Sequence, residues 1–520
     1  MSGVFGICDF ECIPESNDCL LEMQTQLRHF PWCIADTLSD ASAGVYLGRI
    51  GIGKFNSGPQ PVHSEDGKIT VFLAGEFRRT AELRANLESV GAKFIGSTDE
   101  ELLLHAYAIL GVKCFSHLKG QFVCAIWDKI HQQVIVANDR FALYPTYYAV
   151  LSHRLVFAPE VRAVLCDKAV SRCLRDDALA EYFRFQRLLG SKTFFQGVNL
   201  LAPATILSFD LAAGTMSTRK YWDFGSIPIL PESMRFEEAV EEGARLVSSA
   251  VANAASGNWR IGAYLSGGLD SRLIAGLLAQ QGIELRTFTF GQPGCRDEYY
   301  ARRIASAVGA HHNFFPYHDG HWIEKYADLH VQLTEGFHSW LHMHGINMLE
   351  DVRRQIDVNV SGLGDLVWPG SDFTPLALIN APDTIAFSSL LFDLYGYKYS
   401  WPGITYAEER TLYTEPYQKR LRGLAYDSFV RELEPYENLP PYLRAASFNL
   451  TNHFARHLLY HCVFGRSHVE YRLPYFDEDF LSFAYGLPVQ LGLERRVQKG
   501  IITRYLPTLA RIPASADELP

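Results

Sequence analysis

Residues 261–280 read IGAYLSGGLDSRLIAGLLAQ, and this stretch decides the fold of the second half of the chain. An apolar run, residues 261–265, is followed by a turn with two adjacent glycines and then by apolar residues at helical spacing: Leu273, Ile274, Leu277 and Leu278. That order predicts a buried strand, a tight turn and a helix, as in a parallel α/β unit. The turn would lie at the helix N-terminus, where free amides and the helix dipole favour an anion.

The turn, residues 266–271, has the composition of a phosphate-binding loop. Gly267 and Gly268 allow close approach of the backbone, and Ser266 and Ser271 add hydroxyl donors. Asp270 would repel a phosphate unless Mg²⁺ joins the two or the side chain caps the helix. Two glycines alone are also typical of an ordinary tight turn, so the whole hexapeptide carries the prediction.

The rest of the chain divides into two regions with different sequence patterns. Short strand-like runs, such as KITVFLAGEF and QVIVANDR, dominate residues 1–215, and they predict an α+β sandwich. After a segment rich in Gly and Pro, residues 216–235, strands alternate with long helical patterns. We therefore expect two domains, residues 1–215 and 236–520, joined by a linker, and the second domain to carry a parallel sheet with helical additions.

Composition excludes several classes of protein. Of the 520 residues, 48% are hydrophobic and 20% are charged, as in a packed globular chain, and the net charge of -10 disfavours a nucleic-acid partner. No stretch is apolar enough for a membrane span and no signal peptide is visible, so we expect a cytoplasmic protein. The 10 cysteines form no CxxC pair, which argues against disulfides or structural zinc.

The hexapeptide SGGLDS resembles the pyrophosphate-binding loop of the ATP pyrophosphatases, and the chain around it resembles asparagine synthetase B. The segments FTFGQPGCRDEYYARRIASAVGAHH, VSGLGDLVWPGS and YRLPYFDEDFLSFAYGLP follow that family's order. The resemblance implies a synthetase that adenylates a carboxylate with ATP, releases pyrophosphate and lets an amine attack. It also implies an Asp-Glu pair at Asp297 and Glu298.

The resemblance implies a set of site residues in this second domain. Lys499 would be the cation that offsets charge in the transition state. Apart from the resemblance, Glu335 lies on a helix-like segment and is a candidate base, although a solvated helix carboxylate is the more common interpretation. Asp270 and Asp365 would hold Mg²⁺. The residues that would bind the nucleotide are Leu265, Ser266, Gly267, Gly268, Asp270, Ser271, Phe290, Ser361 and Gly362. His338 and His342 are four residues apart, and we interpret them as packing or surface residues rather than as metal ligands.

The first half resembles the class II glutamine amidotransferase domain of the same family, with two departures. The family's catalytic cysteine after the initiator Met is Ser2 here, and its oxyanion-hole Asn-Gly pair is Ala74-Gly75. A hydroxyl is a weaker nucleophile than a thiol, and loss of one oxyanion donor costs about 10²- to 10³-fold in rate. Arg49 and Asp99 still match the positions that hold glutamine. We expect a degenerate Ntn-hydrolase-like domain retained as a scaffold.

Loss of the cysteine makes the chain similar to β-lactam synthetases and lasso-peptide cyclases, whose substrates supply their own amine. Leu363 replaces the Glu or Tyr that relatives carry in the Gly loop, and leucine transfers no proton. We therefore expect a lactam- or macrolactam-forming synthetase that acts on a small-molecule or peptide carboxylate. An ammonia-dependent asparagine synthetase and a nucleotide-binding pseudoenzyme are the alternatives, and a homodimer or a biosynthetic partner protein stays open.

Overall fold

The computed structural model describes residues 2–11, 15–152, 154–317, 319–368, 375–399, 401 and 406–514. By its contacts the chain forms two units. The first comprises residues 1–182, 188–223 and 414–425, and the second comprises 183–187, 224–413 and 426–520. Strand β12 (Thr215–Lys220) therefore belongs to the first unit, although the expected linker, residues 216–235, covers most of it.

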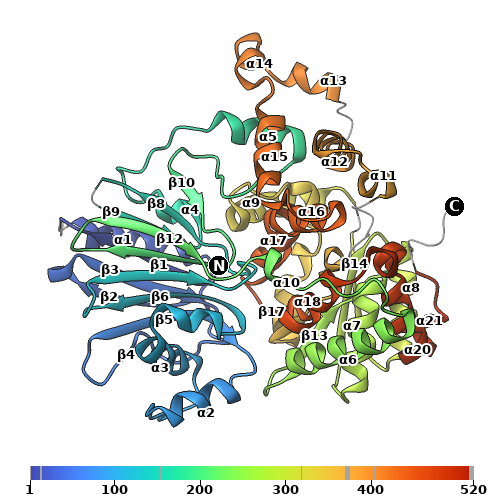
Figure 1. The fold of residues 1–520 in the computed structure, drawn as a ribbon, viewed down its shortest axis with the longest axis horizontal. Coiled ribbons are helices and arrows are strands. Elements are labelled where there is room, and N and C mark those ends of the chain that lie inside the picture. The colour runs from blue at the N-terminus through green and yellow to red at the C-terminus, as the bar shows by residue number, and fades with distance from the viewer. Residues whose placement is uncertain are drawn as a thin grey trace. The chain divides into compact units, whose positions relative to one another are not determined.

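The first unit is a sandwich of two antiparallel sheets (Figure 1). One sheet has the order β10-β8-β9-β1-β3-β2 and the other β12-β11-β7-β6-β5-β4. Their central strands, β1 (Gly3–Asp9), β3 (Val45–Gly51), β5 (Ile69–Phe77) and β6 (Gly120–Asp128), face one another. The remaining strands are β2 (Ile34–Asp40), β4 (Val62–His63), β7 (Gln133–Asn138), β8 (Tyr147–Val150), β9 (Arg154–Ala158), β10 (Val198–Leu200) and β11 (Thr205–Asp210).

Helices cover the outer faces of this sandwich. Helix α1 (Glu15–Leu27) packs on β1 and β3, and α3 (Asp99–Leu110) packs on β5. Both β1 and β5 are buried along their whole length because each lies between the other sheet and a helix. Helix α3 begins where Thr98 caps it, since the Thr98 side chain accepts a bond of 3.3 Å from the Glu101 amide.

The second unit is built on a five-stranded parallel sheet of order β15-β14-β13-β16-β17. The strands are β13 (Ile261–Tyr264), β14 (Arg286–Gly291), β15 (His311–Pro316), β16 (Val358–Val360) and β17 (Glu470–Arg472). The chain leaves β13 toward β14 and β15 and then returns to the other side of β13 as β16. The direction of winding thus reverses between β13 and β16, which is where open α/β sheets bind ligands.

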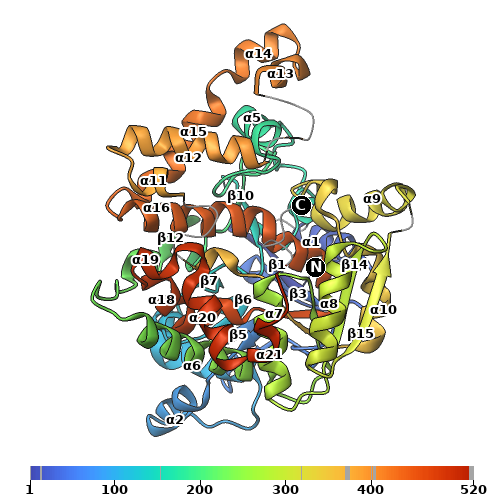
Figure 2. The same ribbon diagram turned by 90° about the vertical axis from the view of Figure 1, so that its right-hand side faces the viewer.

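Helices α6 (Phe236–Ala255), α7 (Leu269–Gln280) and α8 (Arg296–Ala307) pack on β16, β13 and β14. Figure 2 shows α20 (Arg496–Tyr505) beside α7, on which it packs. The predicted apolar face of α7 is buried, Leu273, Ile274 and Leu278 completely. The structure confirms the predicted architecture, an antiparallel sandwich and a parallel α/β unit with added helices. Within the described residues, no helix has the length and apolar character needed to cross a membrane.

Candidate active site

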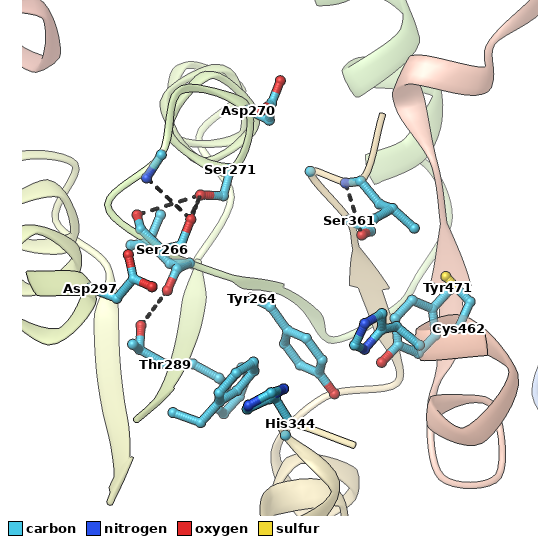
Figure 3. Close-up of a pocket in the computed structure, with 18 of the residues that line it drawn as sticks. Tyr264, Ser266, Asp270, Ser271, Thr289, Asp297, His344, Ser361, Cys462 and Tyr471 are labelled. Atoms are coloured by element: carbon cyan, nitrogen blue, oxygen red, sulfur yellow. Dashed lines mark hydrogen bonds between the residues drawn. The ribbon is translucent and has the colours of Figure 1, made fainter. Parts of the chain in front are cut away.

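A pocket of 330 Å³ lies at the carboxyl ends of β13, β14 and β16 (Figure 3). The SGGLDS loop after β13 forms one side, and residues 361–364 after β16 form the other. Phe288, Thr289 and Phe290 come from β14. Later segments of the chain complete the lining with His344, His461, Cys462, Phe464 and Tyr471. The sheet topology therefore brings the predicted loop and the predicted Gly segment to one pocket.

Internal hydrogen bonds hold the loop open at the start of α7. The Ser271 hydroxyl accepts a bond of 3.1 Å from the Ser266 amide, and the two hydroxyls lie 3.0 Å apart. The Ser266 hydroxyl accepts from the Gly268 amide at 3.2 Å. The Gly267 amide donates to Asp297 Oδ1 at 2.9 Å. These contacts keep the loop wrapped around the helix N-terminus, which is the geometry that favours a phosphate.

Position 362 requires glycine because the backbone of Ser271 approaches it closely. A Cβ atom at this position would lie 2.6 Å from Ser271 Cα and 2.7 Å from the Ser271 nitrogen. No larger residue fits there without moving the loop. The residue also keeps the two sides of the pocket in contact.

Asp270 lies at the first turn of α7 and is held from α20. Gln498 Nε2 donates to its Oδ1 at 2.7 Å, and an Arg495 guanidinium nitrogen lies 2.9 Å from its Oδ2. Burial raises the pKa of Asp270, while the Arg495 charge and the Gln498 bond oppose the shift. Figure 3 shows its side chain directed away from Ser266 and Ser271.

Most of the predicted nucleotide residues line this pocket: Leu265, Ser266, Gly268, Asp270, Ser271, Phe290, Ser361 and Gly362. Gly267 is not part of the lining and takes part through its amide. Asp297 does line the pocket, whereas Glu298 accepts bonds from the Gly294 amide and Arg302. The Asp365 side chain lies outside the described residues, although its backbone begins a short 3₁₀ turn.

The structure does not bring Lys499 or Glu335 to the pocket. Lys499 is exposed and lines a separate hollow on α6 and α20. The α20 helix turns by about 100° per residue, so the face that carries Gln498 toward Asp270 leaves Lys499 pointing elsewhere. Glu335 caps the end of α9 (His321–Thr334) with a φ of 55° instead of lying on the helix. Arg495, rather than Lys499, is the cation that contacts Asp270 of the loop, and the role of Lys499 in the transition state stays a prediction.

Arg495 and Gln498, which hold Asp270, are site residues that sequence reasoning missed, as are His344 and His461 of the pocket lining. Arg495 has a φ of 57° and follows Glu494, whose φ is 53°. Two consecutive non-glycine residues in the left-handed region are strained, and such strain clusters at functional sites. For Arg495 and Gln498, the only signal in the sequence was their three-residue spacing.

The oxygen ligands of the pocket fit a hard cation that is bound by the protein and by a phosphate together. The Asp297 carboxylate lies beside the loop (Figure 3), and carboxylate oxygens are preferred ligands of Mg²⁺. Among the described residues, no group of three or more His, Cys, Asp or Glu side chains is arranged to hold a metal by itself.

Known families match both units. Residues 1–222 match the glutamine amidotransferase domain, and residues 242–514 match asparagine synthase. The chain belongs to the asparagine synthase family. This membership confirms the resemblance to asparagine synthetase B and makes the chain an ATP-dependent carbon–nitrogen ligase. Its place in the cysteine-less branch stays a prediction.

Individual relatives of this chain are distant. The chain is 23% identical to glutamine-hydrolyzing asparagine synthetase 2 of Bacillus subtilis, over 97% of this chain and 69% of the relative. Glutamine-hydrolyzing asparagine synthetase 3 of the same bacterium is 25% identical, over 88% of this chain and 76% of its own length. Amidase chyE of Penicillium rubens is 29% identical over 54% of this chain, which spans only 44% of that protein.

Proposed function

We propose that this ligase adenylates a substrate carboxylate with ATP, releases pyrophosphate, and closes a lactam or macrolactam with an amine of the same substrate, without hydrolysing glutamine. The observation that carries the adenylation step is the pocket itself. An amide-rich loop at a helix N-terminus faces a second Gly segment across the switch point of the sheet. Phosphates at the loop and a nucleoside beside Phe290 fit this arrangement.

The residues of the loop would orient the phosphates. The hydroxyls of Ser266 and Ser271 would donate to them at the positive end of the α7 dipole. Arg495 would fix the Asp270 carboxylate at the first turn of α7. Mg²⁺, when bound beside Asp297, supplies positive charge that offsets the phosphate charge. Asp270 is less suited to the metal because each of its oxygens already accepts a bond.

The first unit supports the absence of glutamine hydrolysis. The amide of Gly75, the backbone donor of the expected oxyanion hole, donates to Asn56 Oδ1 at 2.9 Å. Asn56 in turn donates to Glu100 Oε1 at 2.9 Å. Arg49, the expected glutamine ligand, donates to the carbonyls of Asn56 and Gly58 and pairs with Asp36. The Gly75 amide and the Arg49 guanidinium therefore already bind other groups of the first unit, and Ser2 replaces the thiol.

A substrate that carries its own amine needs no ammonia from glutamine. We infer this substrate class from the internally bonded first unit together with Leu363, which lines the pocket and transfers no proton. Asparagine formation from free ammonia is the second candidate: the names of the two Bacillus relatives favour asparagine as the product, although both names describe glutamine-hydrolyzing enzymes.

The test is isotope exchange between ATP and pyrophosphate with Mg-ATP and a panel of carboxylates. The panel contains aspartate, amino diacids with a second amine, and linear peptides with a free N-terminus and an acidic side chain. Exchange with an amine-bearing acid, followed by its loss of water in mass spectra, supports cyclisation. Exchange with aspartate alone supports asparagine formation, and ATP binding without any exchange supports a pseudoenzyme. The matched variants are Arg495→Ala and Lys499→Ala.

A further inference from the structure

A cluster of buried histidines adjoins the pocket and has no role in the adenylation step. His330 and His338 come from α9 and the residues after it, and His342 ends a 3₁₀ turn (Trp340–His342). His453, His457 and His461 come from the π-helix at Asn449–Leu458 and helix α17 (Leu459–Gly465). His453, His457 and His461 are spaced by four residues, and side chains at that spacing lie on one face of a helix. Segments of π-helix are frequent at functional sites.

His461 is the member of this cluster that reaches the pocket. It is partly exposed and lines the pocket next to Cys462, whereas His338 behind it is 1% exposed. The two rings are 5.0 Å apart and nearly perpendicular. His330 Nε2 lies 3.0 Å from His338 Nδ1, so His338 is itself fixed by a hydrogen bond.

Amide formation from an acyl-adenylate requires a proton acceptor. The amine nitrogen forms a bond to the carbonyl carbon, the bond from that carbon to the AMP oxygen breaks, and AMP leaves with the electron pair. The nitrogen must lose one proton in this exchange. Leu363 occupies the Gly-loop position and offers no acceptor, and Glu335 lies away from the pocket.

We propose that His461 accepts the proton that the attacking amine loses, and that His338 is a positioning residue that orients the His461 ring. The inference rests on the proposed function and adds the base that it lacks. Of the imidazoles that line the pocket, His344 is stacked against Phe290, with ring centroids 6.3 Å apart, on the side where we expect the nucleoside. His461 comes from a different element and is backed by a second imidazole.

The imidazoles at the centre of the cluster have lowered pKa values. Burial lowers the pKa of His461 to about 3, and the nearby His342, His344 and His330 act in the same direction. Burial also lowers the pKa of His338, with further contributions from His461, His330, His342 and the Arg187 guanidinium. The His461 imidazole is therefore neutral at pH 7 with its lone pair available, and it is a weak base until negative charge lies beside it. A phosphate of the adenylate in the same pocket would raise the pKa of His461 toward neutrality.

The experiment separates the two half-reactions in His461→Gln, with the whole chain and the acid that gives the strongest exchange in the panel. We expect ATP–pyrophosphate exchange to stay within about threefold of wild type while amide formation falls by about 100-fold or more. The matched control is His312→Gln, since His312 is also part-buried but lies on β15, outside the pocket lining. In His461→Ala, added imidazole should restore part of the rate, and the deficit should narrow at high pH.

Unchanged amide formation in His461→Gln, with exchange intact, would overturn the role of His461 alone. Equal losses of exchange and amide formation would also overturn it, because they would mark a structural effect. Absence of exchange in the wild type would overturn the proposed function and the proton acceptor with it. His338→Gln tests the positioning role: we expect a smaller loss, confined to amide formation, that imidazole does not rescue.

Discussion

Arg495 and Asp270 form an ion pair across 225 positions of sequence, with an Arg495 nitrogen 2.9 Å from Asp270 Oδ2. Both side chains are 18% exposed, so the pair is only partly screened by solvent. The pair joins the strained start of α20 to the first turn of α7. A negatively charged ligand at the SGGLDS loop would therefore interact electrostatically with the fixed Arg495 guanidinium.

Arg495→Ala should reduce ATP–pyrophosphate exchange by about 100-fold, the usual cost of removing one preorganised electrostatic contact. It leaves Asp270 partly buried beside the loop without its cation. Lys499 lies on α20 four positions after Arg495 and is exposed in a separate hollow, so Lys499→Ala should change exchange by less than about threefold. The reverse ranking of the two variants would restore Lys499 as the transition-state cation. Exchange rates measured at one saturating Mg-ATP concentration decide the ranking.

Gly362→Ala should weaken nucleotide binding and lower stability together. Its Cβ would lie 2.6 Å from Ser271 Cα, and overpacking of this kind typically costs about 1–3 kcal/mol. Calorimetric titration with ATP and a thermal melt measure the two effects. Gly320→Ala is the control, because a Cβ there meets no atom within 4 Å and the backbone has no positive φ. Equal behaviour of the two variants would show that the contact of Gly362 with the loop is unimportant.

Local sequence patterns predicted the SGGLDS loop. The site residues that these patterns did not predict depend on long-range contacts. The hexapeptide, the strand before it and the apolar face of α7 are neighbours in sequence, so their pattern determined the site. Arg495 reaches Asp270 only because residues 494 and 495 adopt left-handed conformations, which no propensity predicts for Glu and Arg. The sequence predicts packing or surface roles for His338 and His342, and their partners His457 and His461 could not be found from it because they lie over 100 positions away.

The buried histidines should make the protein sensitive to mild acid. Burial lowers the pKa of His330 to about 4, below the ordinary value of 6.5. The unfolded chain therefore binds a proton first as pH falls. The neutral His330 contributes fully to the free energy of unfolding above about pH 6.5. This contribution is lost as pH falls toward 4, at about 1.4 kcal/mol per pH unit for each such histidine.

His330→Gln should flatten this dependence. Urea denaturation at pH 6.5 and 5.5 measures the loss of unfolding free energy, and the loss should be about 1 kcal/mol smaller in the variant than in wild type. The absolute stability of the variant does not matter for this comparison. His321→Gln is the control, since that side chain is 80% exposed. An identical pH dependence in wild type and His330→Gln would contradict a neutral, buried His330.

Ser2→Cys should not create a glutaminase, although it supplies the thiol that the first unit lacks. Ser2 is 3% exposed, and the Gly75 amide that would bind an oxyanion already donates to Asn56 Oδ1 at 2.9 Å. Ala74 provides no side-chain amide as a second donor, and each missing donor costs about 10²- to 10³-fold in rate. Ammonia release from glutamine, measured after mass spectrometry has verified removal of the initiator Met, is the assay. Adding Ala74→Asn and Asn56→Ala to Ser2→Cys supplies one donor and releases the other, so activity should first appear in that combination. Glutamine hydrolysis by Ser2→Cys alone would mean that the first unit opens to glutamine despite the Asn56 contact.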